Sequence, residues 1–87
     1  MSDIIYLPAW MHIIICIYDN PDITSSEVHR KTVFTYSHVT HVCQELSFLG
    51  LIKATTTGRM KMLNVTIKGE TLCKLIGQVV KGKLISV

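Results

Sequence analysis

One amphipathic stretch, residues 35 to 52 with the sequence TYSHVTHVCQELSFLGLI, constrains the fold of this chain more than any other. Its apolar side chains recur at steps of three and four residues, which is the spacing of a single stripe along an α-helix. The stripe consists of Val39, Val42, Cys43, Leu46 and Leu49. Thr35 is a suitable N-cap, and Gly50 is suited to end the helix. The sequence therefore predicts a helix with one side facing the core.

The opposite side of this helix is polar and almost uncharged. It carries the hydrogen-bonding side chains of Ser37, Thr40, His41 and Gln44. Groups of this kind on an exposed helix suit the reading of base edges in DNA. The first turn adds free backbone amides and the positive end of the helix dipole. We therefore expect this turn to bind a phosphate favourably beside Tyr36, Ser37 and His38.

Length and charge narrow the class of protein. The 87 residues make one small domain, residues 1–87, whose core is marginal by itself, so dimerisation is a natural supplement. Residues 1–28 carry four acidic side chains and no Lys or Arg, whereas the remainder carries all nine Lys and Arg against only Glu45 and Glu70. This polarity predicts that one face of the protein binds a polyanion.

The three cysteines, Cys16, Cys43 and Cys73, are odd in number and lie in apolar helical patterns. We interpret them as buried free thiols of a protein in a reducing compartment. The alternative is an intracellular disulfide, as found in proteins of hyperthermophiles. The apolar run over residues 4–18 is interrupted by Pro8 and His12 and is shorter than the roughly 20 residues of a membrane span. No basic region precedes it, as one would in a signal peptide. We expect a soluble, cytoplasmic, DNA-associated protein.

The first predicted helix, residues 9–18, is apolar on nearly every side. Pro8 suits the first turn of this helix. Such a helix must be covered all round, and two arrangements are open at this point. Either one side packs in the core and the other on a second subunit, or the helix is central and is wrapped by its own domain.

A helix-turn-helix follows. Ile23 is expected in a short isolated strand, and Thr24-Ser-Ser-Glu27 forms a capping box that starts a helix ending near Thr32. Residues 33–36 then leave room only for a turn before the amphipathic helix. Two short helices joined so tightly are typical of a helix-turn-helix.

Beyond Gly50 the pattern becomes extended. Residues 51–56 and 60–66 flank a predicted hairpin turn at Thr57-Gly58, with Arg59 and Lys61 at or near its tip. Thr66 is expected to cap a last helix that ends at Gly82. Its apolar stripe is Leu72, Leu75, Ile76 and Val79, and its outer side carries Lys68, Lys74 and Lys81. The fold class is mostly α with a small β-hairpin (α+β), a winged helix-turn-helix.

At this point the chain resembles the MarR-type and related winged-helix transcriptional regulators, without gaps, over residues 23 to about 76. The matching segments are Glu27-Val28 at the first motif helix, Ser37-His38-Val39-Thr40-His41 in the recognition helix, Leu46 with Gly50-Leu51-Ile52 at its end, Arg59 in the wing, and Val65-Thr66-Ile67-Lys68-Gly69 at the final junction. The family's small residue in the second helix is replaced by His29, its turn glycine by Val33, and its wing aspartate by Thr57. Ligand sensing does not carry over, and minimal single-domain members of archaea and their viruses are the closer analogy.

The candidate DNA contacts follow from these elements. Ser37, His41 and Gln44 are expected to read bases, and Gln44 suits adenine. Phosphate contacts are expected from Tyr36, His38, Thr40, Ser26, Arg30 and Lys31. Arg59 suits the minor groove, and Lys61 an adjoining phosphate.

Other chemistries find less support. His12 with Cys16, and His38 with His41, have the spacing of paired metal ligands, but neither pair brings a third and fourth ligand, so we expect no metal and no cofactor. No nucleophile has a motif-spaced base, and we expect no enzyme. The sequence predicts a double-stranded-DNA-binding transcriptional regulator, a homodimer joined through the first and last helices, with no small-molecule effector. The alternative is a winged-helix module that docks on transcription or replication machinery through its apolar first helix.

Overall fold

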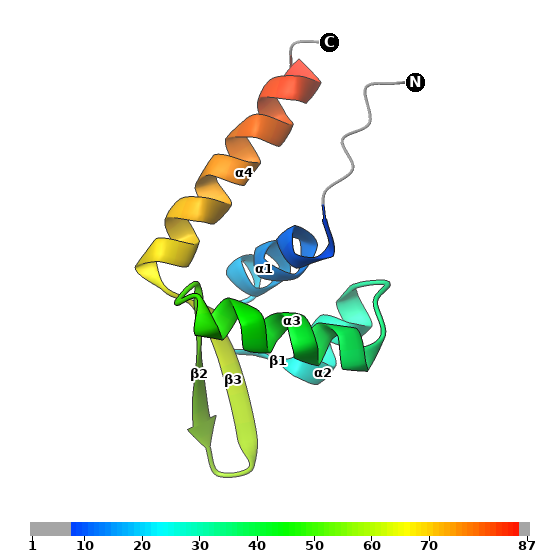
Figure 1. The fold of residues 1–87 in the computed structure, drawn as a ribbon, viewed down its shortest axis with the longest axis vertical. Coiled ribbons are helices and arrows are strands. Elements are labelled where there is room, and N and C mark those ends of the chain that lie inside the picture. Colours follow the sequence, from blue (N-terminus) through cyan, green and yellow to red (C-terminus); the bar gives the residue numbers. More distant parts are fainter. Residues whose placement is uncertain (1–7, 86–87) are drawn as a thin grey trace.

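The computed structural model of the protein describes residues 8–85, with side chains as far as Gln78. Within that range the chain forms four helices and three strands (Figure 1). They are α1 (Ala9–Asp19), β1 (Ile23–Thr24), α2 (Ser25–Lys31), α3 (Tyr36–Phe48), β2 (Ile52–Thr57), β3 (Met60–Val65) and α4 (Ile67–Ile85). This is the predicted order of a winged helix-turn-helix, in which α2 and α3 are the two motif helices and β2 and β3 the wing.

The three described strands form one antiparallel sheet in the order β1-β3-β2. Ile23 lies opposite Leu63, so the prediction of an isolated strand at Ile23 was wrong. The partner strand is forty residues away, and only the tertiary fold brings it there. The hairpin turn is Gly58-Arg59 rather than Thr57-Gly58, because Thr57 still pairs with Met60 and it is Gly58 that adopts the positive φ of 61°.

Both motif helices begin at the caps that the sequence predicts. Thr24 Oγ1 accepts a hydrogen bond from the Glu27 amide (3.3 Å), and Glu27 Oε1 accepts one from the Thr24 amide (3.0 Å). The Thr24 amide, and after it the Thr24 hydroxyl, which also donates to Glu27 Oε1 (3.2 Å), hold the pKa of the Glu27 carboxyl below its ordinary value. At α3, Thr35 Oγ1 accepts from the amide of His38 (3.2 Å). The predicted capping box and N-cap are confirmed.

The end of α3 is a Schellman motif around Gly50. Gly50 has a φ of 77°, its amide donates to the Ser47 carbonyl (3.0 Å), and the Leu51 amide donates to the Leu46 carbonyl (2.9 Å). The predicted role of Gly50 is confirmed. The chain reverses there and enters β2 at Ile52.

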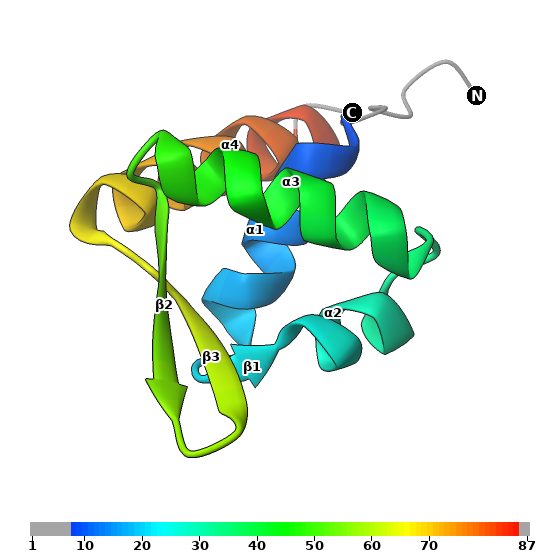
Figure 2. The same ribbon diagram turned by 60° about the horizontal axis from the view of Figure 1, so that its bottom comes forward.

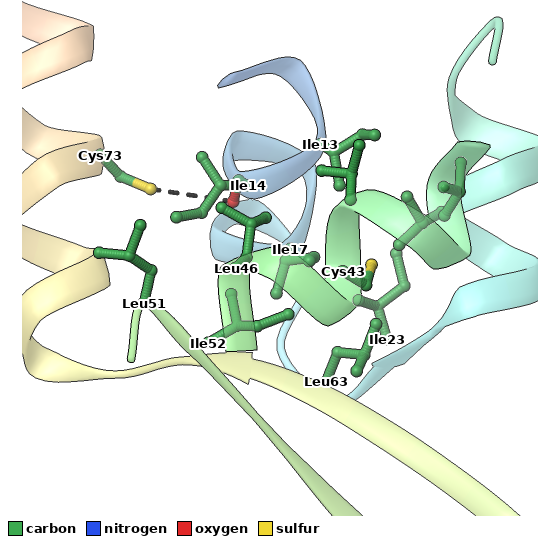
Figure 3. Packing of buried hydrophobic residues seen from close by; sticks show 13 residues of the cluster. Ile13, Ile14, Ile17, Ile23, Cys43, Leu46, Leu51, Ile52, Leu63 and Cys73 are labelled. Carbon is green, nitrogen blue, oxygen red and sulfur yellow. Dashed lines mark hydrogen bonds between the residues drawn. The ribbon is translucent and has the colours of Figure 1, made fainter. Parts of the chain in front are cut away.

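The core gathers around α1. Ile13, Ile14 and Ile17 are essentially inaccessible to solvent, and they pack against side chains of α3, the sheet and α4 (Figure 3). The other buried members of the cluster are Ile23, Val28, Val39, Val42, Cys43, Leu46, Leu51, Ile52, Leu63 and Cys73. Every apolar side chain of α1 is buried or half-buried. The domain itself therefore covers most of the apolar surface of α1. This arrangement is closer to the predicted central helix than to a helix shared evenly between two subunits.

The last helix differs from its prediction in two respects. Its inward side carries Leu72, Cys73 and Ile76, whereas Leu75 is 54% exposed, so the predicted stripe was wrong at Leu75. Val79 lies outside the described side chains. The helix also continues past Gly82 to Ile85, because a glycine weakens a helix by about 1 kcal/mol without interrupting its hydrogen bonds. None of the described helices is long and apolar enough to cross a bilayer.

The three cysteines are free, and Cys43 and Cys73 are buried as predicted, whereas the prediction was wrong for Cys16, which is half-buried. Burial raises the pKa of the Cys43 and Cys73 thiols to about 11, and it also raises the pKa of the half-buried Cys16. Cys73 Sγ donates to the Ile14 carbonyl (3.8 Å), which ties α4 to α1 (Figure 3).

Gly69 in the first turn of α4 is required by close packing rather than by its backbone angle. A Cβ at this position would overlap the carbonyl oxygen of Leu51. We expect Gly69→Ala to lower the free energy of unfolding by about 1–3 kcal/mol, measured by urea denaturation. Gly77→Ala is the matched control, because a Cβ there meets nothing within 4 Å. It should be neutral or gain up to about 1 kcal/mol, and equal effects of the two substitutions would contradict this account.

The buried thiols predict an alkaline loss of stability. The unfolded chain ionises its thiols near their ordinary pKa of 9.0, whereas the folded protein holds Cys43 and Cys73 protonated up to about 11. The unfolded state therefore releases protons first, and the free energy of unfolding should fall as the pH rises through this interval. The double variant Cys43→Ala/Cys73→Ala should show a shallower fall in urea denaturation. An identical pH dependence in the two proteins would refute the assignment.

Candidate nucleic-acid interface

The outer side of α3 is the most exposed polar face of the helix-turn-helix. Val39, Val42, Cys43 and Leu46 of the predicted stripe point inward, but the stripe was wrong at Leu49, which lies at the C-cap and is exposed. Ser37, His41 and Gln44 are exposed on the opposite side, as predicted. Phe48 follows Gln44 by four residues, lies on the same side and is 91% exposed. Phe48 is not among the residues predicted from the sequence, although its spacing from Gln44 and His41 was the available signal.

Two of the candidate side chains on α3 already have partners. Thr40 is half-buried, and its hydroxyl donates to the Tyr36 carbonyl (2.9 Å), so only its lone pairs remain for another group. His41 Nε2 lies 3.5 Å from Glu45 Oε1, with both side chains largely exposed. An exposed pair of this kind contributes little to stability and is easily exchanged for another partner.

The turn between α2 and α3 is built around Phe34. The Phe34 carbonyl is 2.9 Å from His29 Nδ1, and the His29 ring stands edge-on to Tyr36. The Phe34 ring lies between His12 of α1 and His38 of α3, with ring centroids 6.2 and 5.6 Å away. His38 therefore sits on the flank of α3 toward α1. The turn tolerates Val33 because that side chain points into solvent and is 94% exposed.

The candidates on α2 separate into two groups. Ser26 and Arg30 are exposed on its outer side, opposite the buried Val28. Lys31 instead lines a hollow with Cys16 and Phe34 on the α1 side, so the structure does not bring it to the outer face of α3. Its charge lowers the pKa of Cys16, although burial has the larger, opposite effect. Nowhere in the described part of the chain do three His, Cys, Asp or Glu side chains gather as a metal site requires.

The wing, formed by β2 and β3, extends from the end of α3 (Figure 2). Its exposed side chains include the positively charged Arg59 and Lys61. Arg59 is exposed in the hairpin turn and forms no ion pair among the described residues. Thr57 is the last residue of β2 and pairs with Met60. Lys61 is exposed on the side of the hairpin that faces α3, where it lines a hollow of about 200 Å³. The side chains of α3 and the wing thus meet across a shared recess.

The opposite flank of α3 has a different character. A larger hollow of about 580 Å³ is lined mainly by apolar groups, among them Trp10, Leu49 and Leu51, with Phe48 at its edge. Leu49 is 56% exposed. The outer side of α3 is therefore bordered by a polar, positively charged recess toward the wing and by an apolar hollow toward the start of α1.

Comparisons with known proteins place this geometry. No protein-family model matches the sequence, and no curated protein is significantly similar to it. Solved structures do match. FabT of Streptococcus pneumoniae, solved in complex with DNA, is 28% identical, with a TM-score of 0.82 over 88% of this chain and 56% of FabT. SSV1 F-93 is 15% identical, with a TM-score of 0.77 over 94% of this chain and 96% of that protein.

A third match is the multiple antibiotic-resistance repressor MarR of Listeria monocytogenes, which is 20% identical with a TM-score of 0.69 over 90% of this chain and 58% of MarR. The chain thus has the winged-helix fold of MarR-type regulators, and the predicted resemblance is confirmed. It spans little more than half of FabT and MarR but nearly all of SSV1 F-93.

Proposed function

We propose that this winged-helix chain is a sequence-specific, double-stranded-DNA-binding transcriptional regulator and not an enzyme. The observation that carries the proposal is the juxtaposition of an uncharged hydrogen-bonding helix face with a positively charged hairpin. Such a pairing divides the work between reading bases and holding the phosphate backbone. The likeness to FabT, solved in complex with DNA, supports it.

In the proposed complex, α3 lies in the major groove. Ser37, His41 and Gln44 reach base edges, and Gln44 can pair with adenine through its amide. Phe48 is suited to a thymine methyl group. Arg59 enters the minor groove, whose negative potential favours arginine. Tyr36, Ser26, Arg30, Thr40 and His38 are the proposed phosphate contacts, whereas Lys31 is the weakest candidate because it lies toward α1.

We further propose a homodimer joined through α1 and α4. In support, α4 extends away from the rest of the domain (Figure 1), and its Leu75 is 54% exposed. The half-buried Ile15 and Tyr18 of α1 line a hollow of about 460 Å³ beside α4. A two-fold dimer would place two recognition helices about one turn of DNA apart, matching a pseudo-palindrome.

The rival function is a protein-docking module. The apolar hollow beside Trp10, Leu49 and Phe48 favours it, because clustered exposed apolar side chains mark interaction sites. This hollow lies along the C-terminal half of α3, and the predicted docking helix α1 contributes Trp10 to it. A module of this kind would need no preference among DNA sequences.

Selection of bound sequences from a random duplex pool tests the proposed function directly. We expect a consensus with dyad symmetry, because two copies of α3 related by a two-fold axis read inverted half-sites. The measurement is sequencing of the enriched pool, with protein heated to unfolding as the control. Recovery of no consensus would favour the docking module, and a single asymmetric half-site would contradict the dimer.

Arg59→Ala tests the wing. We expect weaker binding to the selected duplex and a salt dependence whose slope is smaller by about 1, because one charged contact is lost. Affinity would be measured by fluorescence anisotropy across a salt titration. Lys53→Ala is the control of equal charge, since Lys53 lies opposite Asn64 at the other end of the hairpin from Arg59. Equal effects of the two substitutions would indicate a general charge effect and contradict a contact by Arg59.

A further inference from the structure

The recess between α3 and the wing combines polar and apolar side chains from α2, α3 and both strands of the hairpin. It is lined by Ser25 of α2, Thr40, Cys43, Gln44 and Ser47 of α3, and Ile52, Ala54, Lys61 and Leu63 of the hairpin. The hydroxyls, the amide and the ammonium group come from elements that meet only in the folded domain. No carboxylate is among the lining residues.

Apart from Thr40, whose hydroxyl donates to the Tyr36 carbonyl, the polar side chains of the recess have no hydrogen-bond partner among the described residues. Within the described residues, Ser25, Gln44 and Ser47 make no side-chain hydrogen bond and Lys61 makes no ion pair. The recess measures about 200 Å³, several times the roughly 30 Å³ that a water molecule occupies in the liquid. It can therefore admit a group of several heavy atoms, and its donors suit one that is negatively charged.

Lys61 is the charged group of this site, and its position is set by the hairpin. It lies directly opposite Thr56 in the ladder, and Leu63 and Ala54 are paired on the same side. Because strand side chains alternate, Lys61 shares the face of Leu63, which is buried under α3. Lys53 lies opposite Asn64 and projects from the other face.

The buried side chains in the recess do not supply a negative charge to pair with Lys61. Cys43 is buried there, and burial raises the pKa of its thiol to about 11 although Lys61 lowers it. The thiol is thus neutral at physiological pH. The ammonium group has no anion beside it in the recess.

We propose that this recess binds one phosphate of the DNA backbone, held by Lys61 of the wing together with Ser25 and Ser47 of the two motif helices, which leaves Gln44 free to reach a base edge. The inference rests on the proposed DNA binding and goes beyond it. It assigns one phosphodiester to a site shared by helix and wing, separate from the Arg59 tip. A phosphate held there bridges α3 and β3, so it fixes the depth of the recognition helix in the groove.

The first test compares Lys61→Gln with Lys53→Gln. Each removes one positive charge from the exposed surface of the hairpin, and only Lys61 lines the recess. Binding to the selected duplex would be measured by anisotropy at several salt concentrations. We expect Lys61→Gln to reduce the slope of log affinity against log salt by about 0.9 and Lys53→Gln to leave it unchanged. Equal slopes for wild type and Lys61→Gln would overturn the proposed phosphate site.

The second test locates the phosphate. Single uncharged methylphosphonate linkages are placed in turn along the selected duplex, and each duplex is titrated with wild type and with Lys61→Gln. We expect one linkage per half-site to weaken wild-type binding and to have little further effect on Lys61→Gln, while other linkages weaken both proteins alike. If the effects of the uncharged linkage and of Lys61→Gln on affinity were additive at every position, the proposed phosphate site would be overturned and the proposed function would stand. Failure of the wild type to bind duplex DNA would overturn both.

Discussion

The carbonyl oxygen of Leu51 lies where the end of α3, the base of the wing and the start of α4 meet. It accepts the amide of Thr66 (3.0 Å), and the bare Cα of Gly69 packs against it. The Thr66 hydroxyl donates to the Gly50 carbonyl (2.6 Å), and Lys68 Nζ donates to the Leu49 carbonyl (3.2 Å). The carbonyls of Leu49 and Gly50, just beyond α3, thus accept hydrogen bonds from side chains at the start of α4. Since β2 leaves from the same place, the end of α3, the base of the wing and the start of α4 cannot move independently.

That junction gives α3 two unlike borders. One side faces the wing across a recess of hydroxyls and one ammonium group, and the other faces an apolar hollow beside Trp10. The helix itself carries no Lys or Arg, so positive charge must come from its neighbours. A protein built in this way separates long-range attraction to a polyanion from short-range recognition. The geometry supports the DNA-binding proposal for that reason, and the apolar border is what keeps a docking role in view.

The departures from the MarR-type pattern have visible physical accommodations. His29 replaces a small residue in α2, and it remains at the surface, where its ring meets Tyr36 and its Nδ1 lies 2.9 Å from the Phe34 carbonyl. Val33 replaces a turn glycine without a positive φ, since Asp22 is the one non-glycine residue with a positive φ in the described chain. Thr57 replaces the wing aspartate and simply extends the ladder opposite Met60. Because position 57 is a threonine, it offers no carboxylate that could orient Arg59 in the wing turn.

The sequence by itself determined the local parts of this protein. The stripe of α3, the capping box at Thr24, the N-cap at Thr35 and the terminating Gly50 are written in short-range spacing, because helix ends and amphipathic faces depend on neighbours within a few residues. Exposure of Ser37, His41 and Gln44 followed from the same period. Tertiary structure alone decided what depends on distant partners. It paired Ile23 with Leu63, wrapped α1, turned Leu75 outward and Lys31 toward Cys16, and brought Ser25, Gln44 and Lys61 around one recess. Spacing along the chain carries no information about such meetings, since they arise only when separate elements bury their apolar faces against one another.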